Sequence, residues 1–271
     1  MNKLLGFMAA AALLGAALPA AAQDAGEREF CADRPGLGTP SCTLDPGRVA
    51  LEVGLWSGAI DDADDVEVDA YAVGDLLLRF GLNDTLEAQV GWTPYAEVEV
   101  RDRASGLRDS VSGSGDLTFV LRQNLANPDG SGLSVAVHAF ASAPTGSDGI
   151  GADAWSGGVI LPVSVDLGGG WALGLAPEVD WVGDADGDGH HAAYAIVAGI
   201  SRGFGDFGLG AELFAGVDDD PDGSTDVQAL EISGTWAPSA LDDVQFDVGV
   251  NAGLNDEATD LGLYAGVAKR F

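Results

Sequence analysis

The 271-residue chain carries 43 acidic and 12 basic side chains, a formal net charge of -31, yet 46% of its residues are hydrophobic. The acidic excess excludes a nucleic-acid-binding protein, because phosphate contacts need Lys and Arg. The hydrophobic content is too high for an acidic disordered chain. The 40 glycines follow no three-residue period, which excludes collagen, and they suit tight turns and β-strands. The composition therefore predicts an exported β-barrel or β-sandwich.

Residues 1–22 have the pattern of a secretory signal peptide. Lys3 is its basic start, residues 4–18 are its apolar stretch, and residues 20–22 are three alanines at a small-residue cleavage site. The apolar stretch is shorter than the ~20 residues that a membrane-spanning helix needs, which disfavours a retained anchor. No later run is long enough for such a helix. A membrane protein with this sequence is therefore expected to span by strands.

Residues 23–47 form a segment rich in proline and glycine that holds both cysteines of the chain, Cys31 and Cys42. Two cysteines in an exported chain most simply form one disulfide. A metal site is disfavoured, because no His or further Cys lies nearby to complete four ligands. We hypothesise that the disulfide-closed loop folds into the periplasmic mouth of a barrel as a plug or brace. A flexible arm is the alternative.

From residue 48 onward, side chains alternate with period two in segments that are separated by turns. In residues 85–100, for example, Leu86 and Val90 face one way, whereas Glu87 and Gln89 face the other. Both barrels and sandwiches contain such strands, so the connections must distinguish them. Twelve strands are predicted, at residues 48–57, 68–80, 85–100, 113–125, 132–143, 156–167, 171–182, 192–202, 206–216, 226–237, 243–254 and 261–271.

The predicted connections alternate in length and chemistry. The short set comprises residues 81–84, 126–131, 168–170, 203–205 and 238–242. The longer set is acidic and includes Asp61, Asp62, Asp64, Asp65, Glu67, Asp184, Asp186, Asp188, Asp218, Asp219, Asp220, Asp222, Asp256, Glu257 and Asp260. Short turns on one side, long loops on the other and an even strand number are typical of bacterial outer-membrane barrels. We therefore predict an all-β fold over residues 48–271, a single transmembrane antiparallel up-and-down β-barrel with both termini in the periplasm.

The last predicted strand supports this fold. Leu261, Leu263 and Val267 fall on one face, and the strand ends on Phe271. Such an ending is usual where outer-membrane barrels close, and we expect it to be read by the barrel-assembly machinery. Aromatic residues at strand ends form the interfacial girdles of such barrels. The candidates are Trp171 and Trp236 at the periplasmic side and Trp56 and Trp181 at the outer side.

Short motifs near both ends of the predicted barrel resemble one bacterial family. They are residues 33–36 (DRPG), 46–52 (PGRVALE), 251–254 (NAGL), 264–266 (YAG) and the terminal Arg270-Phe271. This pattern is similar to an outer-membrane β-barrel family labelled putative transporter, or MetA-pathway of phenol degradation. Membership would imply an outer-membrane channel, linked in some members to uptake of aromatic or other apolar compounds. The cysteine pair and Lys269 on the outward face depart from the family pattern.

The polar faces of the predicted strands supply side chains for the lumen. The candidates are Glu52, Asp75, Arg79, Glu87, Gln89, Asp116, Arg122, His138, Glu178, Asp180, Glu212, Glu231, Asp247, Asn251 and Arg270. One interpretation is a water-filled or gated path whose charged wall tunes selectivity. The alternative is that acids and arginines pair across a narrow lumen and fill it, since twelve strands lie between small filled barrels and wide porins. The acidic excess favours passage of cations or neutral solutes.

One acidic loop resembles the first half of a calcium-binding loop. Asp184, Asp186 and Asp188 would place alternate carboxylates around a hard cation. The second half is missing, because Ala195 stands where the twelfth-position Glu would be. A solvated acidic loop without a metal is the alternative.

The sequence predicts a channel or transporter for passive passage of small solutes across the Gram-negative outer membrane, without a cofactor. An apolar or aromatic solute is implied by the resemblance alone. The expected partners are outer-membrane lipid, lipopolysaccharide, the assembly machinery and the solute, with no nucleic acid. The alternative is a structural or surface-interaction barrel whose acidic loops bind divalent cations or envelope lipid. No enzyme is predicted, because His138 and Ser142 share a lumenal face, whereas a phospholipase needs a bonded Ser–His pair facing lipid.

Overall fold

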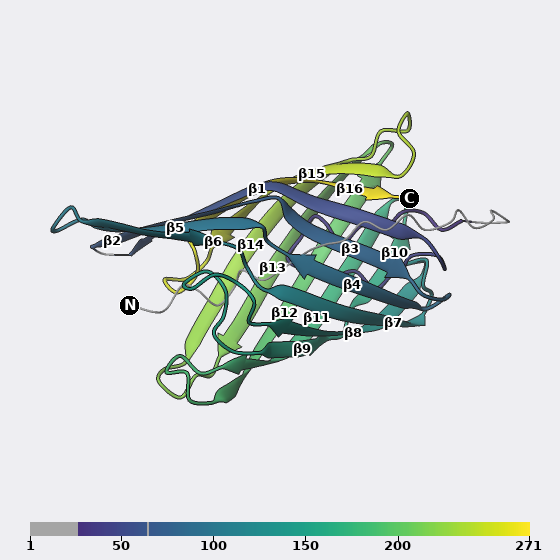
Figure 1. The fold of residues 1–271 in the computed structure, drawn as a ribbon. Helices are drawn as coiled ribbons and strands as arrows, with labels where there is room; N and C mark the ends of the chain where they lie inside the picture. The colour runs from purple at the N-terminus through teal and green to yellow at the C-terminus, as the bar shows by residue number, and fades with distance from the viewer. Residues whose placement is uncertain (1–26, 64) are drawn as a thin grey trace.

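The computed structural model describes residues 27–63 and 65–271, and the predicted signal peptide lies outside the described residues. The regular elements of the described chain are β-strands (Figure 1). A search of the same residues for a helix long and apolar enough to cross a membrane finds none. The strands are β1 (Val49–Ala63), β2 (Val66–Val73), β3 (Asp75–Gly81), β4 (Leu86–Trp92), β5 (Tyr95–Asp102), β6 (Arg108–Gly113), β7 (Leu117–Ala126), β8 (Leu133–Ala143), β9 (Ser156–Ile160), β10 (Val163–Gly168), β11 (Trp171–Gly183), β12 (His190–Phe204), β13 (Phe207–Asp218), β14 (Thr225–Trp236), β15 (Val244–Gly253) and β16 (Leu261–Arg270).

These 16 strand segments form twelve traverses of one closed sheet. Four traverses are interrupted: β2 and β3 at Gly74, β4 and β5 at Thr93-Pro94, β6 and β7 at residues 114–116, and β9 and β10 at residues 161–162. Gly74 has a φ of +78°, and Pro94 has no N–H for a ladder. Neighbouring strands are antiparallel, and β1 pairs with β16 to close the sheet. The predicted twelve-stranded antiparallel barrel is confirmed.

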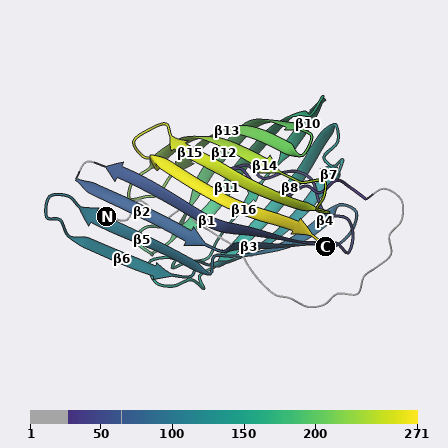
Figure 2. The same ribbon diagram turned by 90° about the horizontal axis from the view of Figure 1, so that it is seen from above.

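Residues 58–63 and 66–67 of the acidic stretch are strand rather than the predicted loop, which is a correction, and Asp64 lies outside the described residues. The ladder between β1 and β2 runs from Ser57 opposite Ala72 to residue 63 opposite residue 66. Together with β5 and β6, this hairpin projects past the rest of the barrel (Figures 1 and 2). Arg103 donates to carboxylates of both Asp62 and Glu67. The sequence indicated a loop because these acids repel one another. The ion pairs of Arg103 reduce that repulsion.

Burial is inverted relative to a water-soluble sheet. In β4, Glu87 and Gln89 are 0% and 2% exposed, whereas Leu86 and Val90 on the other face are half-buried. The outer surface carries large apolar side chains, among them Leu121, Val159, Leu173, Leu209, Val248 and Leu263, and the four tryptophans predicted for the girdles. An apolar exterior around a polar interior is the arrangement of a transmembrane barrel. A sandwich would have the opposite arrangement.

The two ends of the barrel differ, and we name them by their connections. The short-turn end carries residues 82–85, 127–132, 169–170, 205–206 and 237–243. Phe271 lies there too, where its N–H donates to the carbonyl of Val49 at 2.7 Å. The long-loop end carries the projecting hairpins and residues 144–155, 184–189, 219–224 and 254–260. Both the start of β1 and the end of β16 therefore lie at the short-turn end.

Candidate functional site

All of the side chains predicted to line the lumen are buried or half-buried in the barrel, and none is exposed. Ten are buried: Glu52, Arg79, Glu87, Gln89, Asp116, Arg122, His138, Glu231, Asp247 and Arg270. The half-buried ones are Asp75, Glu178, Asp180, Glu212 and Asn251. The interior therefore holds a concentration of charge that a water-soluble core would not tolerate.

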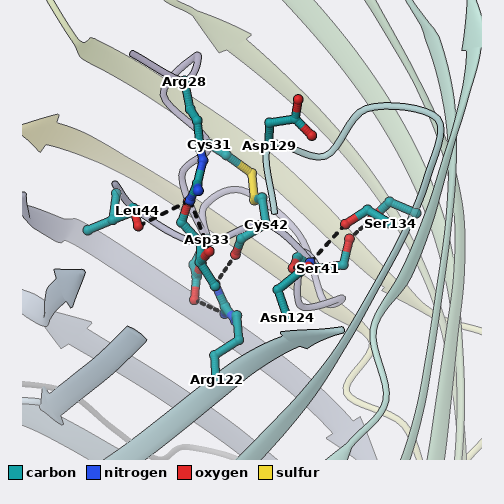
Figure 3. Close-up of a disulfide and its surroundings, with 12 residues drawn as sticks. Arg28, Cys31, Asp33, Ser41, Cys42, Leu44, Arg122, Asn124, Asp129 and Ser134 are labelled. Atoms are coloured by element: carbon teal, nitrogen blue, oxygen red, sulfur yellow. Dashed lines mark hydrogen bonds and ion pairs between the residues drawn. A yellow bond between two sulfur atoms is a disulfide. The ribbon is translucent and has the colours of Figure 1, made fainter. Parts of the chain in front are cut away.

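Residues 27–47, which we call the inner segment, lie against these lumenal side chains. Glu52 accepts hydrogen bonds from the backbone N–H groups of Asp33 (2.9 Å) and Arg34 (3.0 Å). Asn124 on β7 donates to the carbonyl of Ser41 at 2.8 Å (Figure 3). Buried backbone polar groups need such partners. The strands therefore supply the hydrogen bonds that this irregular segment cannot make within itself.

Two buried arginines bind the inner segment to the wall, and we call this set the arginine network. Arg79 donates a bidentate pair to Glu87 at 2.8 and 3.0 Å, and its Nη1 lies 2.8 Å from Glu52. Arg122 donates to both oxygens of Asp33 at 2.8 and 2.5 Å. The four wall side chains have essentially no exposure. Their charges offset one another, so losing one partner would leave a buried charge uncompensated.

Cys31 and Cys42 form the predicted disulfide (Figure 3). Arg79 donates to the carbonyl of Cys31 at 2.8 Å, and Arg122 donates to the carbonyl of Cys42 at 3.2 Å. Both ends of the disulfide-closed loop are thus bound to buried arginines. The disulfide and the arginine network act on the same residues.

We predict that replacing Cys31 and Cys42 together with Ser loosens residues 32–41 but leaves the barrel folded. A disulfide that closes a loop of this size contributes about 3 kcal/mol by constraining the open chain, whereas the strand ladders do not depend on it. Hydrogen–deuterium exchange should become faster in residues 32–41 and stay unchanged in β11–β14. Equal exchange in the two proteins would contradict a bracing role for the disulfide.

A second anchor holds the turn at residues 36–38. One oxygen of Glu212 accepts the N–H groups of Leu37 (2.6 Å) and Gly38 (3.0 Å), and the Tyr264 hydroxyl accepts the N–H of Gly36 (3.2 Å). Gly36 has a φ of +124°, and a Cβ there would lie 2.9 Å from the Glu212 carboxylate. This position therefore requires glycine, both for its backbone conformation and for the close approach.

Two cavities lie beside the inner segment. The first has a volume of about 370 Å³ and lies between that segment and β11–β14. Its wall consists mainly of small residues, which are Ala172, Gly174, Ala176, Gly199, Ser201, Gly203, Gly208, Gly210, Ser233 and Thr235. Gly203 and Gly208 flank a short turn, so this cavity extends toward the short-turn end.

The second cavity has a volume of about 230 Å³ and is lined by Leu37, Ser57, Asp75, Asn251 and other residues. Ser57 and Asn251 belong to the parts of β1 and β15 nearer the long-loop end. Pro35 lines both cavities. The inner segment at residues 35–38 therefore separates two hollow spaces within one lumen.

Charge is distributed unevenly around the lumen. The arginine network occupies the wall formed by β1, β3, β4 and β7. The opposite wall carries four acids that form no ion pair with an Arg, Lys or His among the described residues. They are Glu178, Asp180, Glu212 and Glu231. We call these four residues the acidic wall. Its field favours cations over anions.

Asp116 was predicted to line the lumen, but it organises a loop. Its carboxylate accepts N–H groups from Thr145 (2.8 Å), Gly146 (2.7 Å) and Ala152 (2.7 Å). The same loop packs Ile150 against a small apolar cluster on β2 and β5. Residues 144–155 are thereby folded against the barrel rather than free at its mouth.

The predicted metal ligands do not converge as a group. Asp186 instead accepts the N–H of Asp188 at 2.9 Å. Asp184 lies with a different set, in which its carboxylate is 2.8 Å from Nδ1 of His191, and Asp220 is 3.6 Å from the same atom. Backbone N–H groups of Asp222 and Ala185 lower the pKa of Asp220 below its usual value. These contacts join the loop after β11 to the loop after β13.

His138 and Ser142 have separate partners. Nδ1 of His138 lies 3.3 Å from Arg122, and the Ser142 hydroxyl pairs with that of Thr118. The described residues contain no hydrogen bond between His138 and Ser142, so this pair lacks the nucleophile–base contact that acyl transfer uses.

Sequence reasoning missed Arg34 and Tyr264 as lumenal residues. Arg34 crosses from the inner segment to β15, where it donates to both oxygens of Asp247 at 3.2 and 3.0 Å. The available signal was the charged pair Asp33-Arg34 within a segment otherwise rich in proline and glycine. Tyr264 lies on the same face as Gly262 and Gly266, and the small neighbours obscured its role.

Comparisons with known proteins agree with this geometry. A family model described as "Putative MetA-pathway of phenol degradation" matches residues 32–271. In fold, the chain is similar to the NanC porin, with a TM-score of 0.50 and 10% identity over 82% of this chain and 98% of that one. It is also similar to the translocator domain of the autotransporter NalP from Neisseria meningitidis, with a TM-score of 0.50 and 12% identity over 83% and 88% of the two chains. At these identities the likeness shows the barrel fold alone. A comparison with curated protein sequences finds no match.

Proposed function

Because the chain belongs to the family described as putative MetA-pathway of phenol degradation, we propose that it is a channel that passes small solutes passively across the outer membrane. The observation that carries this proposal is the pair of cavities, about 370 and 230 Å³, on either side of residues 35–38. In a barrel whose lumen is filled by its side chains, packing would close spaces of this size. Residues 35–38 act as the barrier, and movement of this turn joins the cavities.

The lining of the first cavity suggests the solute. Its wall of Ala, Gly, Ser and Thr beside Val197 and Pro40 offers apolar contact and few charges, and its size is that of a small-molecule site. The family description points to aromatic compounds. The acidic wall disfavours anions. We therefore propose a small apolar or aromatic solute that is neutral or cationic, and a protein without catalytic activity of its own.

The proposed orientation places the short-turn end in the periplasm and the acidic long-loop end outside. Lipid would contact the apolar exterior, lipopolysaccharide would contact the long-loop end, and the assembly machinery would recognise β16. The alternative role is a surface barrel whose loops bind divalent cations, for which the cluster of Asp184, His191 and Asp220 is the candidate.

Purified protein in planar bilayers and in liposomes tests the channel. We expect a small conductance with cation preference, and swelling with small neutral solutes. Absence of both conductance and swelling would contradict the channel and favour the surface role. A clear anion preference would contradict the assignment of the acidic wall to the solute path.

We predict that Glu212→Ala increases conductance. The substitution removes the acceptor of the two N–H groups at residues 37 and 38. Hydrogen bonds to a charged group contribute about 1.5–3 kcal/mol each, so the detached turn should become about tenfold more populated or more.

Glu178→Ala is the matched control for this prediction, because it removes a lumenal acid that has no hydrogen bond to the inner segment among the described residues. Single-channel recordings of both variants separate the loss of charge from the loss of the anchor. A conductance of Glu212→Ala no greater than that of Glu178→Ala would show that the turn is not the barrier.

A further inference from the structure

The second cavity contains an acceptor that the proposed channel by itself does not need. Glu231 is fully buried and lines this cavity. Its Oε1 accepts a 2.6 Å hydrogen bond from the Tyr264 hydroxyl, whereas no described donor has hydrogen-bond geometry to Oε2, the nearby Ser233 hydroxyl included. A buried carboxylate oxygen without a donor costs free energy. Oε2 therefore lacks the donor that a buried carboxylate needs.

A second acceptor lies beside it. Asn251 stands directly opposite Glu231 in the ladder between β14 and β15, and its Oδ1 is likewise buried without a partner among the described residues. Residues opposite each other in an antiparallel pair have Cβ atoms about 4.5–5.5 Å apart. The next residue in this row is Gly262 on β16, which adds no side chain. The two acceptors therefore face one small volume that is left open.

The charge around this volume is negative. Arg34 also lines this cavity, and its positive charge acts on Asp75 and Glu231. Its Nε and Nη2, however, donate to Asp247 at 3.2 and 3.0 Å, so one guanidinium faces three carboxylates. Asp75 lines the same cavity and accepts a hydrogen bond from the neutral hydroxyl of Thr93 at 2.6 Å. Neither Asp75 nor Glu231 has an ion pair with another described residue. The missing donor is therefore expected to carry positive charge.

We propose that this cavity binds a protonated primary amine with a small apolar body. An ammonium group has three N–H donors and no acceptor, which suits Glu231, Asn251 and a third oxygen of the cavity. Pro35 and Leu37 lie in the same lining and contact the apolar body. A hard metal ion fits less well, because it takes six or more oxygen ligands. The role of this site in permeation rests on the proposed channel function, whereas binding itself does not require conduction.

Ligand-observed NMR on the purified full-length protein in detergent micelles at neutral pH tests the proposal, with benzylammonium as the probe. Benzyltrimethylammonium carries the same charge without N–H donors, and benzyl alcohol has a donor without charge. Losing a charge-assisted hydrogen bond corresponds to about tenfold in affinity. Benzylammonium should therefore bind at least about tenfold more tightly than either comparison compound.

Two variants locate the binding. Glu231→Gln should weaken benzylammonium binding about tenfold, whereas Glu178→Gln, which alters a lumenal acid outside this cavity, should leave it unchanged. Equal binding of the three probes, no binding of benzylammonium, or an unchanged affinity in Glu231→Gln would each overturn the proposal. The comparison of probes uses the unaltered protein, so it does not depend on the folding of a variant. Conductance measured in parallel tests the channel separately, because the protein can bind the amine without conducting, or conduct without binding the amine.

Discussion

Replacing Arg122 with Met is expected to destabilise the barrel by about 3–5 kcal/mol and to free the inner segment. Arg122 is fully buried and donates to both oxygens of Asp33 and to the carbonyl of Cys42. Met conserves much of the volume but supplies neither charge nor donors. Asp33 would then keep the ion pair with Arg79 alone, at 3.0 Å, inside a wall already rich in carboxylates. The least costly response is for residues 31–42 to leave the lumen.

Arg108→Met is the matched control for this substitution. Its guanidinium pairs with Glu99 at 2.7 Å, but the side chain is 55% exposed, and an exposed pair contributes about 0–1 kcal/mol. Urea unfolding followed by tryptophan fluorescence would measure the change in free energy of unfolding, and bilayer recordings would measure conductance. If Arg122→Met unfolds and conducts like Arg108→Met, the arginine network does not hold the inner segment.

Replacing Gly174 with Phe is expected to reduce conductance about tenfold or more while the barrel stays folded. Gly174 is opposite Ser164 in the ladder between β10 and β11, and Ser164 faces the lumen, where its hydroxyl accepts from that of Ser41. Gly174 therefore faces inward as well. An added Cβ would have no heavy atom within 4 Å, so the ring can enter the first cavity without displacing backbone.

Val179→Phe provides the matched control, since it adds a ring on the same strand outside the first cavity. Val179 is 51% exposed on the outer surface, so its substitution should leave conductance unchanged. Single-channel recordings and solute swelling of the two variants would decide the matter. Undiminished conductance in Gly174→Phe would place the solute path outside the first cavity.

The strand pattern was predictable because period-two alternation is local. The face of β4 that carries Glu87 and Gln89 was identified from sequence, and this face is the buried one. The predicted disulfide of Cys31 and Cys42 followed from cysteine number and context, and it is present. The projecting hairpin was not predictable in the same way. Its acidic residues indicated a loop because Arg103, which neutralises Asp62, lies 41 positions away in the chain.

The position of the inner segment was open on sequence grounds. Proline, glycine and a disulfide are compatible with a plug, a brace or a flexible arm, since none of these features names a partner. The partners are Glu52, Arg122 and Glu212, which lie on three different strands. These alternatives could be separated only by the contacts themselves, which the period-two pattern does not encode.

By itself, the sequence determined the all-β class, the number of traverses, the polar interior and the family resemblance, because each depends on the order of neighbouring residues. Only the tertiary structure decided which lumenal charges pair, as between Arg34 and Asp247, and which remain unpaired, as at Glu231. The physical reason is that alternation specifies the face on which a side chain lies but not what stands across the lumen. The closing of β16 on β1 and the return of residues 27–47 into the interior bring those partners together.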